Sequence, residues 1–158
     1  MNPEEDFALP RPGYTALRKG RVSTTGQVYL VTTVVAGRAP IFANWLSAAP
    51  ACRLFHRPVE DSRFLAWVLM PDHFHGVLEL GEGASLPQVM RLYKGRTAVA
   101  VNREMGRRGS LWQDGFHDHA LRKEEDLEQV ARYVVENPIR AGMVDRVSDY
   151  PFWNAEWL

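Results

Sequence analysis

The stretch RFLAWVLMPDHFHGVLEL, residues 63–80, decides the fold. Its first eight residues form a nearly continuous apolar run of strand length, and residues 73–80 form a second run of similar length. A Pro-Asp pair separates the two runs and is typical of a tight turn. The stretch therefore predicts a hairpin of two antiparallel strands.

The segments on both sides of this hairpin add two strands and three helices. We expect, in chain order, a strand over residues 27–35, a helix within residues 41–56, a helix over residues 88–105, a strand within residues 111–122 and a helix over residues 124–137. Pro50 should interrupt or kink the first helix, and Pro138 should end the last one. This order predicts an α+β fold, with one antiparallel sheet and helices packed on it.

The length of 158 residues and the apolar content of 46% fit one domain with a sizeable core. We expect residues 1–24, with three prolines and little periodicity, to form an extended arm, and residues 25–158 to form the domain. The single cysteine, Cys52, excludes an internal disulfide and a zinc site built mainly of thiolates. The acidic N-terminus lacks a signal pattern, and no apolar segment has the length of a membrane helix. We therefore expect a cytoplasmic protein without a membrane partner.

Charge is balanced overall, with 19 basic and 19 acidic side chains, but it is unevenly distributed. The balance argues against a protein that coats nucleic acid through bulk charge. Two basic clusters stand out, and their members are Arg18, Lys19 and Arg21 in the first and Arg91, Lys94, Arg96, Arg103, Arg107 and Arg108 in the second. A solvated helix face would explain one such cluster, whereas two of them favour contacts with phosphates.

Two of the five histidines, His73 and His75, are separated by a single residue in the second strand of the hairpin. Because side chains alternate across a strand, both imidazoles project from the same face, together with Val77 and Glu79. Two histidines at this spacing can ligate one metal ion when a third ligand comes from elsewhere. The spacing alone is weak evidence, because such pairs also occur by chance.

The last predicted helix carries a tyrosine at the rim of its apolar stripe. Tyr133 and Asn137 lie four residues apart, and therefore one helical turn apart on the same side. If this helix packs on the sheet, the phenol oxygen and the amide could both meet the histidine pair. From the residues alone, a boundary tyrosine with a satisfied hydroxyl is the better-supported interpretation.

Four segments together resemble the REP-associated tyrosine transposases, an IS200-like group within the HUH single-tyrosine transposases and endonucleases. They are VLMPDHFHGVLEL (residues 68–80), LWQDGFHDHALR (111–122), ARYVVENPIRAGMV (131–144) and PFWNAEWL (151–158). The resemblance runs in order from about Gln27 to the C-terminus. It implies a ferredoxin-like α+β fold and a bacterial protein associated with the nucleoid.

The resemblance also implies roles for particular residues. His73 and His75 match a metal-binding pair, Tyr133 matches a catalytic tyrosine, and Asn137 lies where relatives place an amide as a third metal ligand. The implied cofactor is a divalent ion, Mg²⁺ or Mn²⁺, although imidazoles would also accept Zn²⁺. The implied partner is single-stranded DNA folded into a hairpin, cleaved through a 5′-phosphotyrosine and rejoined without a nucleotide cofactor. Relatives act as monomers or as homodimers.

Two other functions stay open. One is a hairpin-binding protein that retains the fold and no longer cleaves DNA; the complete set of four site residues argues against it. The other is an unrelated histidine-metal hydrolase, which would need a general base such as Glu79 and would be indifferent to the tyrosine. A second alternating pair, His117 and His119, is expected to be structural or to lie on a DNA-contacting strand. Tryptophans are more often core residues than stacking platforms, and the candidates for stacking are Trp112, Trp153 and Trp157.

Overall fold

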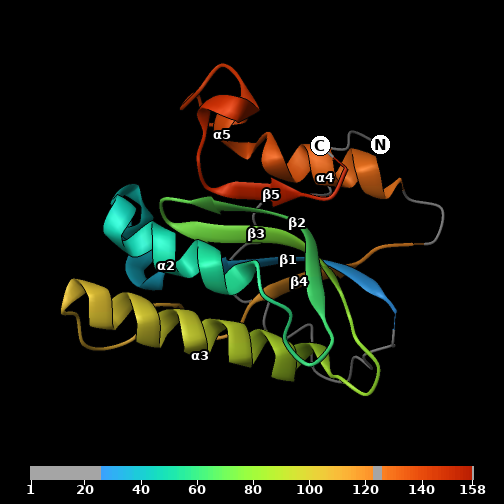
Figure 1. Cartoon of the computed structure of the whole chain (residues 1–158), viewed down its shortest axis with the longest axis horizontal. Helices are drawn as coiled ribbons and strands as arrows, with labels where there is room; N and C mark the ends of the chain where they lie inside the picture. Colours follow the sequence, from blue (N-terminus) through green and yellow to red (C-terminus); the bar gives the residue numbers. More distant parts are fainter. Residues whose placement is uncertain (1–25, 123–125, 158) are drawn as a thin grey trace.

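The computed structural model, shown in Figure 1, describes residues 26–122 and 126–157. Its strands are β1 (Val28–Val34), β2 (Arg63–Met70), β3 (His73–Glu79), β4 (His117–Ala120) and β5 (Trp153–Ala155). Its helices are α2 (Trp45–Phe55), α3 (Leu86–Met105), α4 (Leu127–Val135) and α5 (Asn137–Arg140), with short 3-10 turns η2 (Ala36–Arg38), η3 (Ile41–Ala43) and η4 (Val147–Asp149). The predicted arm over residues 1–24 lies outside the described residues. Within the described ranges, every helix is too short or too polar to cross a membrane.

The five strands form one antiparallel sheet in the order β4-β1-β3-β2-β5. The chain path from β1 to β4 runs β–α–β–β–α–β, which is the ferredoxin-like arrangement. The expected α+β fold is thus confirmed, and the predicted hairpin is β2 and β3. In Figure 1, α2 and α3 cover one face of the sheet, whereas α4 and α5 lie on the other side.

The core between the sheet and helices α2 and α3 is rich in aromatic rings. Phe74, on β3, stacks on Phe55 of α2 with ring centroids 3.6 Å apart and an interplanar angle of 12°. Phe64, on β2, packs edge-on against Phe74 with centroids 4.9 Å apart. Gly76 makes room for this packing, because a Cβ atom there would lie 2.7 Å from Phe64 Cδ1. These rings hold β3 in place from the face opposite the histidine pair.

A second core lies between the sheet and α4, where Leu30, Val68 and Val77 line the sheet side. The helical period predicts an apolar stripe of Leu127, Val130, Ala131, Val134 and Val135. Leu127 is partly buried against this core, and the other four are buried in it. Asp126 caps the helix by accepting hydrogen bonds from two backbone N–H groups of the first turn. A helix of nine residues is marginally stable alone. Packing on the sheet stabilises α4, because each large apolar side chain that is fully buried contributes about 1.5–3 kcal/mol.

Neither proline ends the helical path, although Pro50 was expected to interrupt or kink its helix and Pro138 to end the last one. Pro50 lies inside α2, which continues through it. The helix loses one backbone hydrogen bond there, but the buried Ala48 and Ala51 on either side retain their packing. Pro138 does not stop the helical path, because it lies in the first turn of α5, where an N–H group would have no helical partner. The chain therefore makes one more helical turn beyond the predicted end.

Strand β5 was not predicted. It has three residues and pairs with the free edge of β2, so it is too short to show a period-2 pattern in the sequence. Tyr150, just before β5, donates a hydrogen bond to the Leu69 carbonyl oxygen at 2.5 Å. This bond ties the connection to the sheet and brings the chain after α5 back to β2.

Candidate active site

The histidine pair lies on the central strand of the sheet. His73 and His75 are on β3, and Thr32 on β1 and Val68 on β2 are the cross-strand partners of His75. Both side chains face the α4 side, as the strand period predicted, because they share parity with Val77 of the second core. Only 6% of His73 and 3% of His75 is exposed. The imidazoles are therefore held in fixed positions by the sheet beneath and the helices above.

One ring nitrogen of each histidine is bonded to an oxygen. His73 Nδ1 lies 2.7 Å from Asp72 Oδ1, and His75 Nδ1 lies 2.5 Å from Thr32 Oγ1. A carboxylate only accepts, so Nδ1 of His73 carries the hydrogen and its Nε2 carries the lone pair. Asp72 is itself held by Arg38, whose Nη1 lies 3.2 Å from Asp72 Oδ2. These contacts fix the orientation of both rings.

Both imidazoles are neutral near neutral pH. The pKa of His75 falls to about 3, first because the ring is buried and then because His73 and Arg140 contribute positive charge. Burial also lowers the pKa of His73, against the opposing effect of the Asp72 carboxylate. The Nε2 atoms of both rings are buried and have no hydrogen-bond partner among the described residues. Neutral rings with unpaired Nε2 atoms fit a metal ion, because metal binding requires deprotonated imidazole.

Tyr133 and Asn137 belong to the helices that cover the same face as the histidine pair. Tyr133 is a half-buried residue of α4, which packs on β2 and β3. Asn137 is half-buried and is the first residue of α5, which packs on β2. Glu136, between the two helices, has helical backbone angles of φ −81° and ψ 0°. The predicted relation of one helical turn between Tyr133 and Asn137 is therefore kept.

A third metal ligand would have to come from an amide, a hydroxyl or water. Across residues 26–122 and 126–157, no three side chains of the types His, Cys, Asp and Glu are grouped to hold an ion. The Asn137 amide, on the helix above the histidine pair, is the side chain that the sequence pattern singled out for this place.

Arg140 is a site residue for which the sequence pattern predicted no role. Its guanidinium carbon lies 3.8 Å from the centroid of the Tyr133 ring, and its Nη2 donates a hydrogen bond to the Tyr133 carbonyl oxygen. The charge of Arg140 also contributes to the lowered pKa of His75. The sequence feature that could have indicated this contact is the spacing of seven residues between Tyr133 and Arg140, which equals two turns of an uninterrupted helix.

Three other potential nucleophiles among the described residues are occupied or inert. Burial raises the pKa of the Cys52 thiol to about 12. Burial also raises the pKa of Tyr93 and Tyr150, whose hydroxyls donate to the carbonyl oxygens of Arg57 and Leu69. These two tyrosines are therefore structural, and none of the three residues shares the setting of Tyr133.

The predicted DNA-contacting residues of the second basic cluster lie away from the histidine pair. They belong to α3 and the turn after it, on the opposite face of the sheet (Figure 1). Lys94 is engaged inside the protein, because its Nζ donates to the carbonyl oxygens of Gln113 and Gly115. Arg107 donates to the Asn102 amide oxygen. The exposed members are Arg91, Arg96, Arg103 and Arg108. The first basic cluster, Arg18, Lys19 and Arg21, lies outside the described residues.

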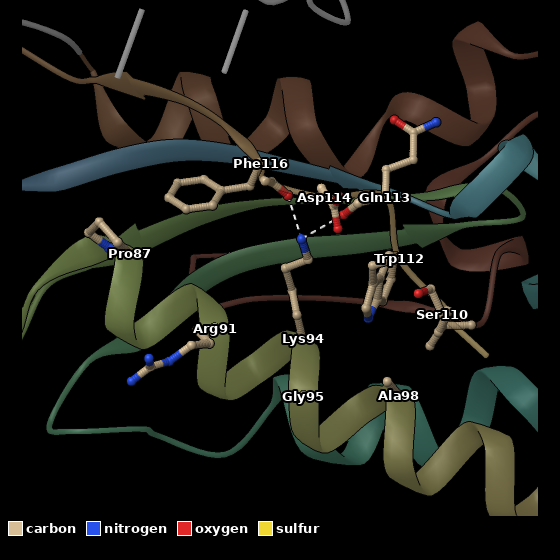
Figure 2. A pocket seen from close by; sticks show the side chains of 12 residues that line it. Pro87, Arg91, Lys94, Gly95, Ala98, Ser110, Trp112, Gln113, Asp114 and Phe116 are labelled. Carbon is tan, nitrogen blue, oxygen red and sulfur yellow. Dashed lines mark hydrogen bonds between the residues drawn. The ribbon is translucent and has the colours of Figure 1, made fainter. Parts of the chain in front are cut away.

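A cavity of about 420 Å³ lies between α3 and the loop that precedes β4. Figure 2 shows Lys94 reaching across it to the loop carbonyls, while the Arg91 guanidinium points away from this contact. Trp112 lines the cavity, but it is only 5% exposed and its indole N–H donates to Thr97 Oγ1. Trp112 is thus a core residue, in agreement with the commoner role of tryptophan. This cavity is separate from the histidine pair.

The second histidine pair lies on the edge strand β4. His117 is the cross-strand partner of Thr32, so it faces the same side of the sheet as His75, with β1 between them. His117 and His119 are both half-buried. Trp153 is half-buried on β5 at the other edge, and Trp157 is 38% exposed.

Several known proteins are similar to this chain. Residues 24–137 match the family described as transposase IS200 like. The chain is 33% identical over 97 residues to the REP-associated tyrosine transposase of Escherichia coli K12, which covers 61% of this chain and 54% of that protein. It is 26% identical over 149 residues to a Haemophilus influenzae protein that carries the same name provisionally, with 82% of this chain and 80% of that protein covered.

A solved structure described as a REP-associated tyrosine transposase bound to a REP hairpin has a TM-score of 0.65 and 25% identity to this chain. The likeness covers 84% of this chain and 79% of that one. The chain spans about half the length of the Escherichia coli relative. The family match itself covers most of the chain and includes the histidine pair, Tyr133 and Asn137. The chain therefore belongs to the IS200-like transposase family.

Proposed function

We propose that this protein cleaves and rejoins single-stranded DNA at or near hairpins, with Tyr133 as the nucleophile and a divalent metal ion as the cofactor. The observation that carries the proposal is the arrangement on one face of the sheet. Two buried, neutral histidines leave their Nε2 atoms unpaired beneath the helix that carries Tyr133. Membership of the IS200-like transposase family supports the same activity.

His73 and His75 would hold the ion through their Nε2 atoms, with the Asn137 amide as third ligand. Asp72 and Thr32 keep each ring in the orientation that this requires. A bound Mg²⁺ or Mn²⁺ would polarise a non-bridging oxygen of the phosphodiester and stabilise the charge that develops there. The mixed imidazole and amide donors leave other positions for water and phosphate oxygens, as these ions prefer.

Tyr133 would attack phosphorus in line with the bond to be broken. A bond forms between the phenol oxygen and phosphorus, the bond from phosphorus to the 3′-oxygen breaks, and the 3′-oxygen takes up a proton as the phenol gives one up. The product is a 5′-phosphotyrosine, which retains a phosphodiester bond. A free 3′-hydroxyl can then attack this intermediate and rejoin a strand, so no nucleotide cofactor is needed.

A hairpin of single-stranded DNA is the partner that the relatives support. One solved relative is described as bound to a REP hairpin. Phosphates away from the cleaved linkage would meet the exposed arginines of α3, such as Arg91, Arg96 and Arg103. Lys94 would contribute less, because its ammonium group is bound to two carbonyl oxygens.

Glu79 cannot serve as the general base that the alternative function, a histidine-metal hydrolase, would need. Glu79 lies at the far end of β3, four residues from His75, which is about 13 Å along a strand. Its carboxylate is paired with Arg63 at 3.4 Å. Glu79 therefore has neither the position nor the freedom to activate water at the histidine pair.

The test incubates the protein with labelled single-stranded hairpin DNA and Mn²⁺, and then looks for a covalent adduct on a denaturing gel. We expect an adduct that is lost with Tyr133→Phe and with His73→Ala. His119→Ala is the matched control, since it removes a histidine from the edge strand β4, and its adduct should remain. An adduct that survives Tyr133→Phe would refute the assignment of the nucleophile. Binding without any adduct, over several hairpins from the host genome, would favour the non-cleaving hairpin binder.

A further inference from the structure

We propose that Arg140 is a catalytic residue that binds the phosphate attacked by Tyr133. This inference rests on the proposed cleavage activity and adds a residue to it. The guanidinium would donate hydrogen bonds to a non-bridging oxygen of the scissile phosphate, on the side away from the histidine pair. It would also hold the tyrosine ring in position for the attack.

The position of Arg140 is the first support. Its guanidinium carbon lies 3.8 Å from the centroid of the Tyr133 ring, so the charged group stands directly beside the phenol. One N–H donates to the Tyr133 carbonyl oxygen. A guanidinium has five N–H donors, and so others remain for a ligand. A phosphate in line with the phenol oxygen would lie within their reach, because that oxygen is one bond beyond the ring.

The charge of Arg140 is the second support. The arginines that flank it in the sequence are paired, Arg132 with Glu128 at 2.9 Å and Arg146 with Asp149 at 3.3 Å. No carboxylate in the part of the chain that the structure describes forms an ion pair with Arg140. Because guanidinium groups bind phosphate well and with two parallel bonds, an anionic ligand is the natural partner for this unused charge.

The balance of charge at the site points the same way. Arg140 belongs to α5, which packs on the same side of the sheet as the histidine pair, so a cation held there would be a second positive centre on that face. Two such centres repel one another unless an anion lies between them. The carboxylate of Asp72, next to His73, is already bonded to His73 and Arg38. A phosphodiester placed between the ion and Arg140 would supply the missing negative charge.

The local backbone explains how Arg140 is held. Pro138 begins α5, and the backbone N–H of Arg140 donates to the Glu136 carbonyl oxygen at 3.1 Å. Asn137 and Arg140 are three residues apart on this one helical turn, and thus they lie on the same side of it. A single short helix would therefore present both the amide for the metal ion and the guanidinium for the phosphate.

The first test compares single-turnover rates of adduct formation for three variants. Removal of one group that stabilises charge in the transition state costs about 100-fold to 1,000-fold in rate. We expect Arg140→Gln to lose about this much, and Arg140→Lys to lose less because it keeps the charge without the planar fork. Arg132→Gln is the matched control, because it removes an exposed arginine of α4 that is paired with Glu128, and it should stay within about twofold.

The second test asks whether the guanidinium meets the phosphate itself. In the non-cleaving Tyr133→Phe background, hairpin affinity is measured with a normal linkage and with an uncharged methylphosphonate at the mapped cleavage position. The neutral linkage should weaken binding by about tenfold or more, in the range of a lost charged hydrogen bond. This penalty should shrink several-fold when Arg140→Gln is added. An unchanged penalty would show that Arg140 does not contact the phosphate.

The outcomes separate the two proposals. If the wild-type protein forms no adduct, the proposed cleavage fails, and the role of Arg140 fails with it. If the wild-type protein forms an adduct and both Arg140→Gln and Arg140→Lys form it at the wild-type rate, only the role of Arg140 is overturned. If Arg140→Gln unfolds, as judged by circular dichroism, the rate and the methylphosphonate penalty of Arg140→Lys decide the matter.

Discussion

Two adjacent threonines on β1 provide a sharp test of how the histidine pair is held. Thr32 faces the histidines, and its hydroxyl bonds to His75 Nδ1 at 2.5 Å. Thr33 faces the other side, and its buried hydroxyl has no hydrogen-bond partner among the described residues. Valine has nearly the shape of threonine and lacks the hydroxyl. The same substitution at these two neighbours should therefore have opposite effects.

The expected magnitudes follow from what each hydroxyl does. Thr32→Val leaves His75 Nδ1 buried without a partner, which costs about 1–3 kcal/mol of stability. Thr33→Val removes a buried hydroxyl that has no described partner, so it should be neutral or stabilising by about 1 kcal/mol. In a chain of this size, 1 kcal/mol corresponds to about 2–4 °C in Tm. Loss of the partner that orients His75 should also weaken metal binding by about 10-fold to 100-fold.

Urea unfolding of the metal-free proteins gives the stability differences, and calorimetric titration with Mn²⁺ gives the metal affinities. Thr33→Val should bind Mn²⁺ like the wild type, because Thr33 pairs with Phe74 and its side chain lies on the opposite face of the sheet. Equal stability changes in the two variants would refute the hydrogen-bond reasoning. Unchanged Mn²⁺ affinity in Thr32→Val would refute the role of Thr32 in orienting the metal ligand.

Two further predictions concern stability. Gly76→Ala should destabilise the fold by about 1–3 kcal/mol in urea unfolding, because the new Cβ would lie 2.7 Å from the tightly packed Phe64 ring. A decrease in the free energy of unfolding below about 0.5 kcal/mol would mean that this ring can move. In chelator, the free energy of unfolding should fall as the pH drops below about 6.5, because unfolded His75 takes up a proton while the folded form, with a pKa of about 3, does not. That contribution to stability is fully present above pH 6.5 and is lost toward pH 3. His75→Gln should flatten the dependence of the free energy of unfolding on pH. An unchanged dependence in this variant would contradict the burial argument.

Much of the fold could be predicted because local patterns report which face of an element is buried. The period-2 pattern placed His73 and His75 on one face of a strand and Phe74 on the other, and the structure agrees. The period of 3.6 residues identified the buried stripe of α4. These patterns depend only on backbone geometry, which is the same in every protein.

The two prolines show where local rules stop. A proline excludes one hydrogen bond, but whether the chain bends, continues or starts a new helix depends on what packs around it. Packing of Ala48 and Ala51 carries α2 through Pro50, and the path after Pro138 makes one more turn as α5. That turn carries Arg140 back to Tyr133, a contact for which the sequence offers only the seven-residue spacing.

By itself, the sequence determined the elements other than β5 and α5, the α+β class, the shared face of the histidine pair and the one-turn spacing of Tyr133 and Asn137. Only the tertiary structure decided that α4 and α5 cover the histidine face, that α3 places its arginines on the opposite face, and that Arg140 stands beside Tyr133. The physical reason is that periodicity encodes which side of an element is apolar. Which element then buries that side depends on contacts between residues far apart in the chain.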